Sequence, residues 1–271
     1  MSAPTSVPIG GRGEVVADRH GHVLLVTINR PEARNAISAQ VALGIGESLE
    51  YADATRDIRA VIVTGAGDQA FCAGQDLKEA ARGVRLTDPR ADRWGFAGFV
   101  KHAISKPIIA AVNGSALGGG TEIVLASDLA VAADTATLGL PEVKRGIIAA
   151  AGGAFRLSRQ IPSKIALETM LTGLPISAER ALQLGLVNRV VEADQVLDEA
   201  FALAELVAAN APLAVQSSKL IAHGIADGRI PAEEDDWLRT AEQMQAIRAS
   251  SDAHEGVRAF VEKRAAHWQG M

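Results

Sequence analysis

Three short segments of the sequence combine glycine with acidic side chains in a spacing that could do chemistry. They are FCAGQDLKE (71–79), NGSALGGGTE (113–122) and LGLPEVKRG (138–146). The glycines 118–120 stand between an apolar run and a helical segment, where the N–H groups of a helix N-terminus can bind an anion or an oxyanion. Because three successive glycines cost backbone entropy, close approach of a ligand or of another backbone explains them better than packing alone.

Two glutamates in these segments could act as acid and base. Glu122 follows Gly119 by three residues, so its carboxylate shares a helical face with whatever the glycine N–H binds. Spacing alone leaves an equal alternative, since an acid is also favourable at any helix N-terminus. Glu142 follows Pro141 in a predicted loop, where a surface carboxylate would be ordinary.

Other candidate motifs fail on their context. The segment GAGDQA (65–70) fits the pattern G-x-G-x-x-A of dinucleotide-binding loops. No amphipathic helix follows it and no acid ends a second strand about twenty residues later, so we reject a dinucleotide site. The histidines have no zinc spacing. Cys72 has no histidine nearby in the sequence and is expected to be a small buried hydrophobe rather than a nucleophile.

Periodicity predicts an α/β core that becomes helical toward the C-terminus. Apolar runs predict strands at 15–18, 23–29, 60–64, 108–112 and 129–133. Helical segments alternate with the later runs, as in a parallel sheet. Ser38 and Ser177 are expected to cap helices. We expect a flexible tail over 1–13, a core over 14–200 and a helical region over 201–271.

Composition and charge narrow the class of protein. The 271 residues are 48% hydrophobic and 22% charged, which is typical of a globular protein. The net charge of −5 argues against a general nucleic-acid binder. A lone cysteine suits a reducing cytosol, so we expect a cytoplasmic protein. The longest weakly polar stretch, 107–121, is shorter than the ~20 apolar residues that a membrane span needs, so no membrane contact is expected.

Taken together, the motifs resemble one family. NRPEARNAIS, FCAGQDLKE, ALGGGTE, GLPEVKRG and AAAGG occur in the order found in the enoyl-CoA hydratase/isomerase, or crotonase, superfamily. The resemblance extends from about Val15 to the terminal AFVEKRAAHW. It implies an α/β crotonase (ClpP-like) spiral of ββα units with a helical C-terminal trimerisation region, assembled as a homotrimer or a dimer of trimers. It also implies an acyl-CoA thioester substrate that carries coenzyme A, with no further cofactor and no metal.

The resemblance also implies a mechanism. In the family, two backbone N–H groups form an oxyanion hole for the thioester carbonyl, and they map onto Gln75, where alanine is more common, and Gly119. Hydratases of the family hold two glutamates, which match Glu122 and Glu142. The implied enzyme is an enoyl-CoA hydratase (a lyase), as in β-oxidation of fatty acids. Glu122 would take a proton from water attacking Cβ, and Glu142 would deliver a proton to Cα.

Further positions match substrate- or CoA-binding residues of the family, namely Arg30, Ala73, Asp76, Lys78, Gly118, Ala150, Phe260 and Lys263. Arg30 and Lys78 would lie near the phosphates or the pantetheine. Phe260 and Lys263 would lie on a helix that reaches the adenine end of a neighbouring subunit's site. The Ala150 N–H would hold the water, at a place where many hydratases have a Pro-Gly pair.

Alternatives to the hydratase remain open. The stretch 141–162 is also similar to carnitinyl-CoA dehydratase. An enoyl-CoA isomerase would shift a double bond through Glu142 without adding water. Two retained glutamates count against a noncatalytic acyl-CoA- or RNA-binding relative, and the lack of a Ser and His pairing counts against a serine peptidase on this fold. The segment 82–99, with Trp94, Phe96 and Phe99, lines the acyl end in relatives or is equally a helix's apolar stripe.

Overall fold

Two sheets form the centre of the computed structural model, which describes residues 1–271 except 1–3, 11–12, 77–78 and 80–87. The larger sheet has the order β1 (Thr5–Ser6), β2 (Val15–His20), β3 (Val23–Ile28), β4 (Ala60–Gly65), β6 (Ile108–Val112), β8 (Leu129–Ala133) and β11 (Arg189–Val191). It is antiparallel from β1 to β3 and parallel from there on. The smaller sheet has the order β10 (Ile176–Ser177), β9 (Thr137–Gly139), β7 (Ser115–Leu117) and β5 (Ala70–Cys72).

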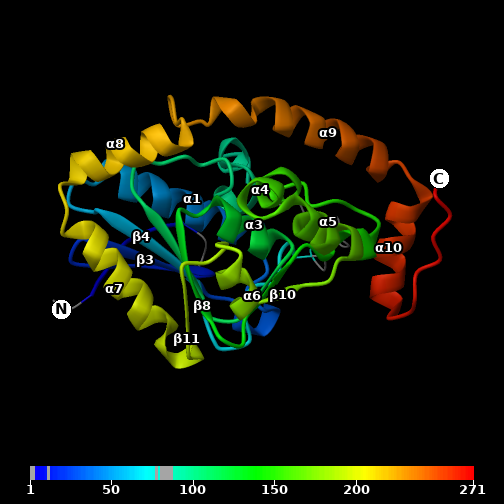
Figure 1. The fold of residues 1–271 in the computed structure, drawn as a ribbon, viewed down its shortest axis with the longest axis horizontal. Coiled ribbons are helices and arrows are strands. Elements are labelled where there is room, and N and C mark those ends of the chain that lie inside the picture. Colours follow the sequence, from blue (N-terminus) through cyan, green and yellow to red (C-terminus); the bar gives the residue numbers. More distant parts are fainter. Residues whose placement is uncertain (1–3, 11–12, 77–78, 80–87) are drawn as a thin grey trace.

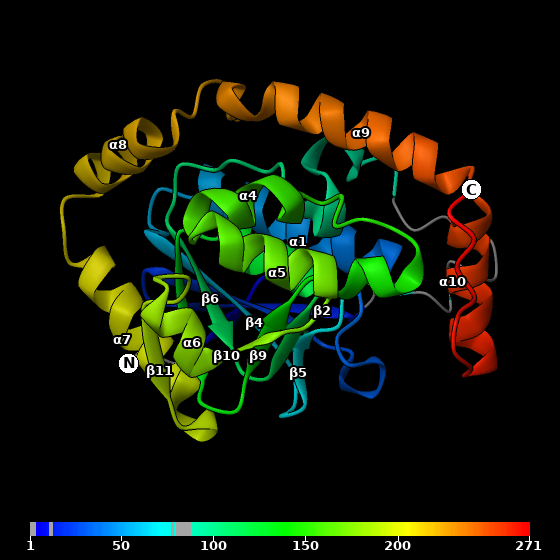
Figure 2. The ribbon, with the colours of Figure 1, turned by 45° about the vertical axis from the view of Figure 1, so that its right-hand side comes forward.

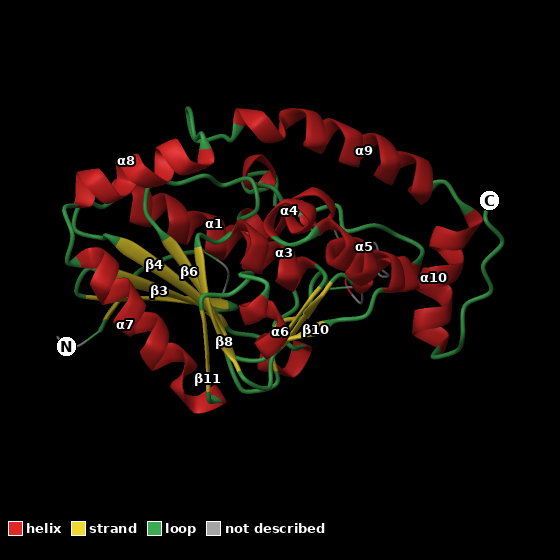
Figure 3. Cartoon of the chain, in the orientation of Figure 1, coloured by secondary structure: helices red, strands yellow, loops and turns green. Residues whose placement is uncertain are grey.

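Helices surround these sheets, as Figures 1 and 3 show. They are α1 (Ala39–Ala54), α3 (Gly119–Ala126), α4 (Gly153–Gln160), α5 (Ser163–Thr172), α6 (Ala178–Gln183), α7 (Val196–Ala208), α8 (Pro212–His223), α9 (Glu234–Arg248) and α10 (Ser251–Glu262). A 3-10 turn, η4 (Pro141–Arg145), follows β9. The last three helices form an arc around the core, with α9 above α4 and α10 beside the C-terminus (Figure 2). None of the single helices in the described ranges has the length and apolarity needed to cross a membrane, although a bent pair, Ala193–Ala208 with Pro212–His223, has both.

A β-β-α unit repeats along the chain. β6 of the larger sheet leads to β7 of the smaller sheet and then to α3, and β8 leads in the same way to β9, η4 and α4. Successive units pair in parallel in both sheets, β6 with β8 and β7 with β9. The repeat therefore winds as a spiral, and it brings the ends of β5, β7 and β9 to one place.

The local signals in the sequence explain most of these elements. The five predicted strands are confirmed as β2, β3, β4, β6 and β8. All side chains of β4 and β6 are buried, as their continuous apolar runs predict for strands covered on both faces. The hydroxyl of Ser38 accepts a hydrogen bond from Val41 N–H, and that of Ser177 accepts one from Arg180 N–H. Both predicted N-caps are confirmed.

The two expected boundaries differ from what the structure shows. We expected 1–13 to be a flexible tail, whereas β1 pairs with β2 and Val7 is buried. We placed the end of the core at residue 200, which falls inside α7, a helix that packs on β4, β6 and β8. The strand and helix pattern in the sequence does not show that β1 and α7 pack on the core, so the boundaries at residues 13 and 200 leave out part of the packing.

Candidate active site

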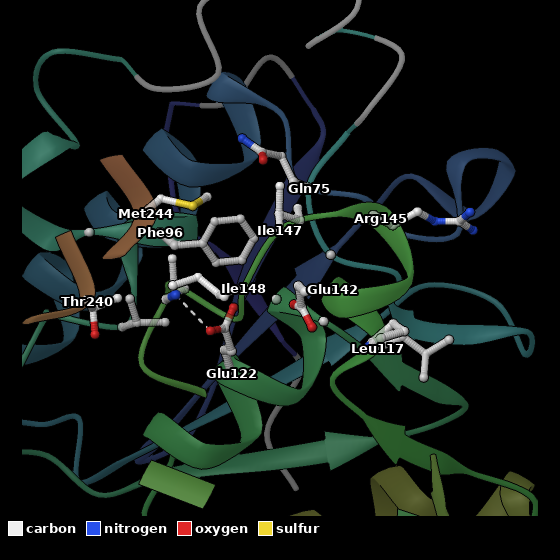
Figure 4. Close-up of a pocket in the computed structure, with 18 of the residues that line it drawn as sticks. Gln75, Phe96, Leu117, Glu122, Glu142, Arg145, Ile147, Ile148, Thr240 and Met244 are labelled. Carbon is white, nitrogen blue, oxygen red and sulfur yellow. Dashed lines mark hydrogen bonds between the residues drawn. The ribbon is translucent and has the colours of Figure 1, made fainter. Parts of the chain in front are cut away.

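A cavity of about 720 Å³ opens where the spiral brings β5, β7 and β9 together (Figure 4). Its wall includes the residues after β5, the start of α3, the turn η4, and parts of α9 and α10. The three glycine-rich acidic segments of the sequence therefore meet at one site, although their outermost lining residues, Ala73 and Arg145, are 72 positions apart in the chain.

Two residues of this wall, Gln75 and Gly119, carry backbone N–H groups that could bind one oxygen atom, and we call them the N–H pair. A β-carbon on Gly74, whose φ is +87°, would stand 3.2 Å from the Gly119 nitrogen, so the two loops touch. Ile37 N–H donates to Gly74 and Ile37 C=O accepts from Asp76, so the N–H of Gln75 is directed away from Ile37. Gly119 begins α3, where an N–H has no intrahelical acceptor.

Each of the three successive glycines has its own steric reason. A β-carbon on Gly120 would lie 2.1 Å from the Cys72 carbonyl oxygen, and one on Gly119 would lie 2.3 Å from the ring of Phe96. At Gly118 it would lie 2.9 Å from Oε1 of Glu142. The run therefore serves both the packing of α3 on β5 and the space that the cavity needs. The buried Cys72, with a thiol pKa raised to about 12 by burial, is the inert hydrophobe that was predicted.

Glu122 projects into the cavity from the first turn of α3 and is only 3% exposed. Its Oε1 accepts hydrogen bonds from the N–H groups of Ala151, at 2.7 Å, and Gly153, at 2.9 Å. Burial raises the pKa of Glu122 to about 8, and the nearby charge of Glu142 adds to the effect. One oxygen is thus fixed while the group is poised to exchange a proton near neutral pH.

Glu142 enters the cavity from η4 and lies beside Glu122 in Figure 4. Burial raises its pKa to about 7. Its Oε2 is buried and has no hydrogen-bond partner among the described residues. Because a buried polar atom without a partner is unfavourable, the arrangement is typical of a group that acts on a ligand.

We expect the raised pKa of Glu122 to appear as a pH-dependent loss of stability. The folded chain holds a proton that the unfolded chain releases between pH 4.5 and about 8, so this contribution is full below the lower value and is lost as pH rises through the upper one. Glu122→Gln keeps a carbonyl oxygen for both N–H donors and cannot lose that proton. The free energy of unfolding of the wild type, minus that of the variant, should fall between about pH 4.5 and about pH 8 in denaturant titrations. A constant difference would contradict the raised pKa.

Eight of the twelve residues that the sequence assigned to the site line the cavity. They are Ala73, Gln75, Gly118, Gly119, Glu122, Glu142, Ala150 and Phe260. Arg30 and Asp76 stand behind the wall, where Arg30 Nη2 donates to Asp76 Oδ2 at 2.9 Å and Nη1 donates to Ala36 C=O at 2.7 Å. Lys263 ends α10 outside the wall, and Lys78 lies outside the described residues. We infer that Arg30 and Asp76 position the loop that carries Gln75.

The C-terminal helix contributes to the cavity of its own chain. Phe260, which the resemblance assigns to the adenine end of a neighbouring subunit's site, lines the cavity of its own chain in this structure, with the Arg145 guanidinium 4.3 Å from its ring centre. α10 approaches η4 so closely that a β-carbon on Gly256 would lie 2.0 Å from the Arg145 carbonyl oxygen. Gly256 therefore allows α10 to close one end of the site.

Sequence reasoning missed the residues that line the rest of the cavity, which include Lys101, Arg145, Trp237, Thr240, Met244 and Arg248. Trp237 and Met244 are seven residues apart and so share a face of α9, which is the one local signal they carry. The aromatic residues in the described part of the segment 82–99 lie in different places. Phe96 lines the cavity, whereas Phe99 is buried in the core and Trp94 donates through Nε1 to Glu50 at 3.1 Å.

The spiral fold, the N–H pair and two carboxyl groups with raised pKa values in one cavity define a class of enzymes that stabilise a developing oxyanion and move protons beside it. Residues 18–271 match the family model described as enoyl-CoA hydratase/isomerase. The chain belongs to this family, and the expected α/β crotonase fold is confirmed.

Several relatives are similar over nearly the full chain. A carnitinyl-CoA dehydratase from Citrobacter koseri is 42% identical and aligns over 93% of this chain and 97% of its own. The crystal structure of a carnitinyl-CoA hydratase from Mycobacterium avium is 52% identical with a TM-score of 0.94, covering 96% of this chain and 100% of its own. An enoyl-CoA hydratase from Mycobacterium tuberculosis is 42% identical with a TM-score of 0.74, covering 95% and 99%.

Proposed function

We propose that the chain is a hydro-lyase of acyl-CoA thioesters, which interconverts a 3-hydroxyacyl-CoA and a 2-enoyl-CoA by removing or adding water. One observation carries this proposal: the buried Glu122 and the half-buried Glu142, both with raised pKa values, line one cavity together with the N–H pair. The names of the relatives at 41–42% identity favour a carnitinyl-CoA dehydratase-like enzyme over a general hydratase of β-oxidation.

In the proposed mechanism, the thioester carbonyl oxygen accepts hydrogen bonds from the N–H pair. Negative charge that develops on this oxygen is stabilised at the N-terminus of α3, so enolate character at Cα becomes accessible. During hydration Glu122 takes a proton from the water that attacks Cβ, and Glu142 delivers a proton to Cα. Dehydration follows the same steps in reverse. The substrate supplies coenzyme A itself, and the mechanism needs no other cofactor.

The two glutamates must differ in protonation while they share a site. Burial raises the pKa of both, and their mutual repulsion makes the state with one proton dominant near neutrality, so the pair titrates as a unit. Two N–H donors stabilise the ionised form of Glu122, whereas Oε2 of Glu142 receives no hydrogen bond from the described residues. The pKa values alone would leave the proton on Glu122, whose pKa of about 8 exceeds the value of about 7 for Glu142. Because the two N–H donors favour the ionised form of Glu122, we assign the charge to Glu122 and the proton to Glu142 when substrate is bound.

Product analysis tests the proposed function. Purified protein is mixed with crotonyl-CoA, longer 2-enoyl-CoA thioesters and carnitinyl-CoA, and the enoyl ultraviolet absorbance is followed together with product chromatography. We expect the absorbance to fall with 2-enoyl substrates, as 3-hydroxyacyl-CoA forms. With a 3-hydroxyacyl substrate such as carnitinyl-CoA, we expect the absorbance to rise as the enzyme removes water. Formation of a 3-enoyl-CoA without water addition would support the isomerase instead, and binding without any turnover would refute the hydro-lyase.

We also propose that the chain is cytoplasmic and assembles as a homotrimer or a dimer of trimers. Large apolar side chains on α7 and α8 support an assembly, because Leu206, Leu213 and Ile221 are 61%, 78% and 81% exposed in the single chain. Light scattering is expected to give three or six times the chain mass of 28.3 kDa. A monomer at micromolar concentration would contradict the assembly.

A further inference from the structure

Under the proposed function, on which this inference rests, a bound thioester runs along the cavity in one direction. Its carbonyl oxygen lies at the N–H pair, Cα at Glu142 and Cβ at Glu122, so the acyl chain continues past Glu122. Figure 4 shows Glu142 on the side of Arg145, and Glu122 on the side of Thr240 and Met244. The distal end of the acyl group therefore faces α9, whose Trp237 packs against Gly152, between the two residues that hold Glu122.

A lysine marks this end of the cavity. Lys101 lines the wall, and its Nζ lies 4.4 Å from the ring centre of Trp237, the first α9 residue of the lining. No carboxylate within the described ranges forms an ion pair with Lys101. Burial and the nearby charge of Arg156 both lower the pKa of Lys101, whose side chain remains partly open to solvent.

A second cation lies behind the same indole ring. The Arg156 guanidinium is 5.4 Å from the Trp237 ring centre and only 6% exposed. Glu233 neutralises it through hydrogen bonds of 2.9 Å and 2.7 Å from Nε and Nη2. Its Nη1 is buried without a partner among the described residues, and a β-carbon on Gly152 would lie 3.4 Å away.

None of the four acidic side chains that precede Trp237 forms an ion pair with Lys101, and Glu234 and Asp235 are exposed. Glu233 is occupied by Arg156, and Asp236 pairs with both Arg159 and Arg239. Apart from the catalytic glutamates, the described lining of the cavity contains no carboxylate. At the acyl end, the ammonium group of Lys101 therefore lies on the indole ring of Trp237 without an ion pair among the described residues. Nη1 of Arg156, near the same ring, has no hydrogen-bond acceptor among them.

We propose that the substrate's acyl group ends in a carboxylate, so that the enzyme acts on the CoA monothioester of a dicarboxylic acid, with Lys101 as the specificity-determining residue. A distal carboxylate would pair with Lys101 in a partly dehydrated site, where an ion pair is stronger than in water. The trimethylammonium group of a carnitinyl thioester would instead meet a like charge, which disfavours its binding. The names of the relatives therefore describe the reaction of this chain better than its substrate.

Three 2-enoyl-CoA thioesters of matched length, ending in methyl, carboxylate or trimethylammonium, test the proposal. We expect kcat/KM to be highest for the carboxylate, by roughly tenfold or more over methyl, and lowest for trimethylammonium. Lys101→Glu should reverse the order of the two charged substrates, and Lys101→Met should bring the carboxylate near the methyl value. Lys164→Glu, on the exposed face of α5, makes the same charge change elsewhere and should leave the order unchanged.

A wild type that prefers methyl or trimethylammonium, or an order that Lys101→Glu leaves intact, would overturn the proposal. Calorimetric Kd values for the corresponding saturated thioesters separate this outcome from a failure of the proposed function. Tighter binding of the carboxylate without turnover of any enoyl substrate would refute the hydro-lyase and support the charge preference. Turnover of all three substrates at similar rates would support the hydro-lyase and refute the charge preference. Circular dichroism checks that both Lys101 variants are folded.

Discussion

Glu122→Gln is expected to lower kcat for hydration by roughly 10² to 10⁴-fold, the usual contribution of a general base. The amide can still accept hydrogen bonds from Ala151 and Gly153 through its carbonyl oxygen, so the side chain keeps its place while it loses the ability to take a proton from water. Steady-state kinetics with the best 2-enoyl-CoA substrate give the fall in kcat. KM should change little, because the N–H pair still binds the thioester carbonyl.

A matched control separates the loss of a base from the general effect of an amide. Glu168→Gln makes the same change on the exposed side of α5, away from the cavity, and should leave kcat within about twofold of the wild type. Turnover by Glu122→Gln at the rate of the control would rule out Glu122 as the base. If the far-ultraviolet circular dichroism of Glu122→Gln also falls, the loss in kcat reflects misfolding instead.

Much of the fold was predictable because its signals are local. The N-caps at Ser38 and Ser177 and the buried runs of β4 and β6 depend on neighbours within a few positions, and the structure confirms them. The position of Glu122 three residues after Gly119 is likewise a property of one helix turn, but it left two equal interpretations, and only the fold places the side chain in the cavity.

The acyl end could not be predicted, because its residues meet only through tertiary packing. Lys101 and Trp237 are 136 positions apart, and their contact depends on how α9 crosses the core. Glu142 had a matching family position but no local signal, since its burial depends on η4 packing against α10. Arg30 was assigned to coenzyme A from the family pattern, whereas its ion pair with Asp76 became visible only in the fold.

Glu142→Gln is expected to abolish proton delivery to Cα and to lower hydration by about 10²-fold or more. Both substitutions lower the rate of hydration, so steady-state kinetics do not show which glutamate transfers the proton at Cα. A saturated acyl-CoA has no Cβ site for water, so exchange of its Cα hydrogen with deuterated water reports on the N–H pair and on the group beside Cα. We expect the exchange to stop in Glu142→Gln.

The same exchange should persist in Glu122→Gln. A neutral side chain at 122 removes the like charge that helps to keep Glu142 protonated, so Glu142 ionises more readily and can remove the Cα hydrogen itself. Mass spectrometry of the recovered thioester measures the deuterium taken up, and Glu179→Gln on the exposed surface of α6 serves as the control. Exchange that stops in Glu122→Gln but continues in Glu142→Gln would reverse the two roles. Only the ionised form of Glu142 can remove the Cα hydrogen. The exchange rate in Glu122→Gln should therefore also rise with pH until Glu142 is fully ionised.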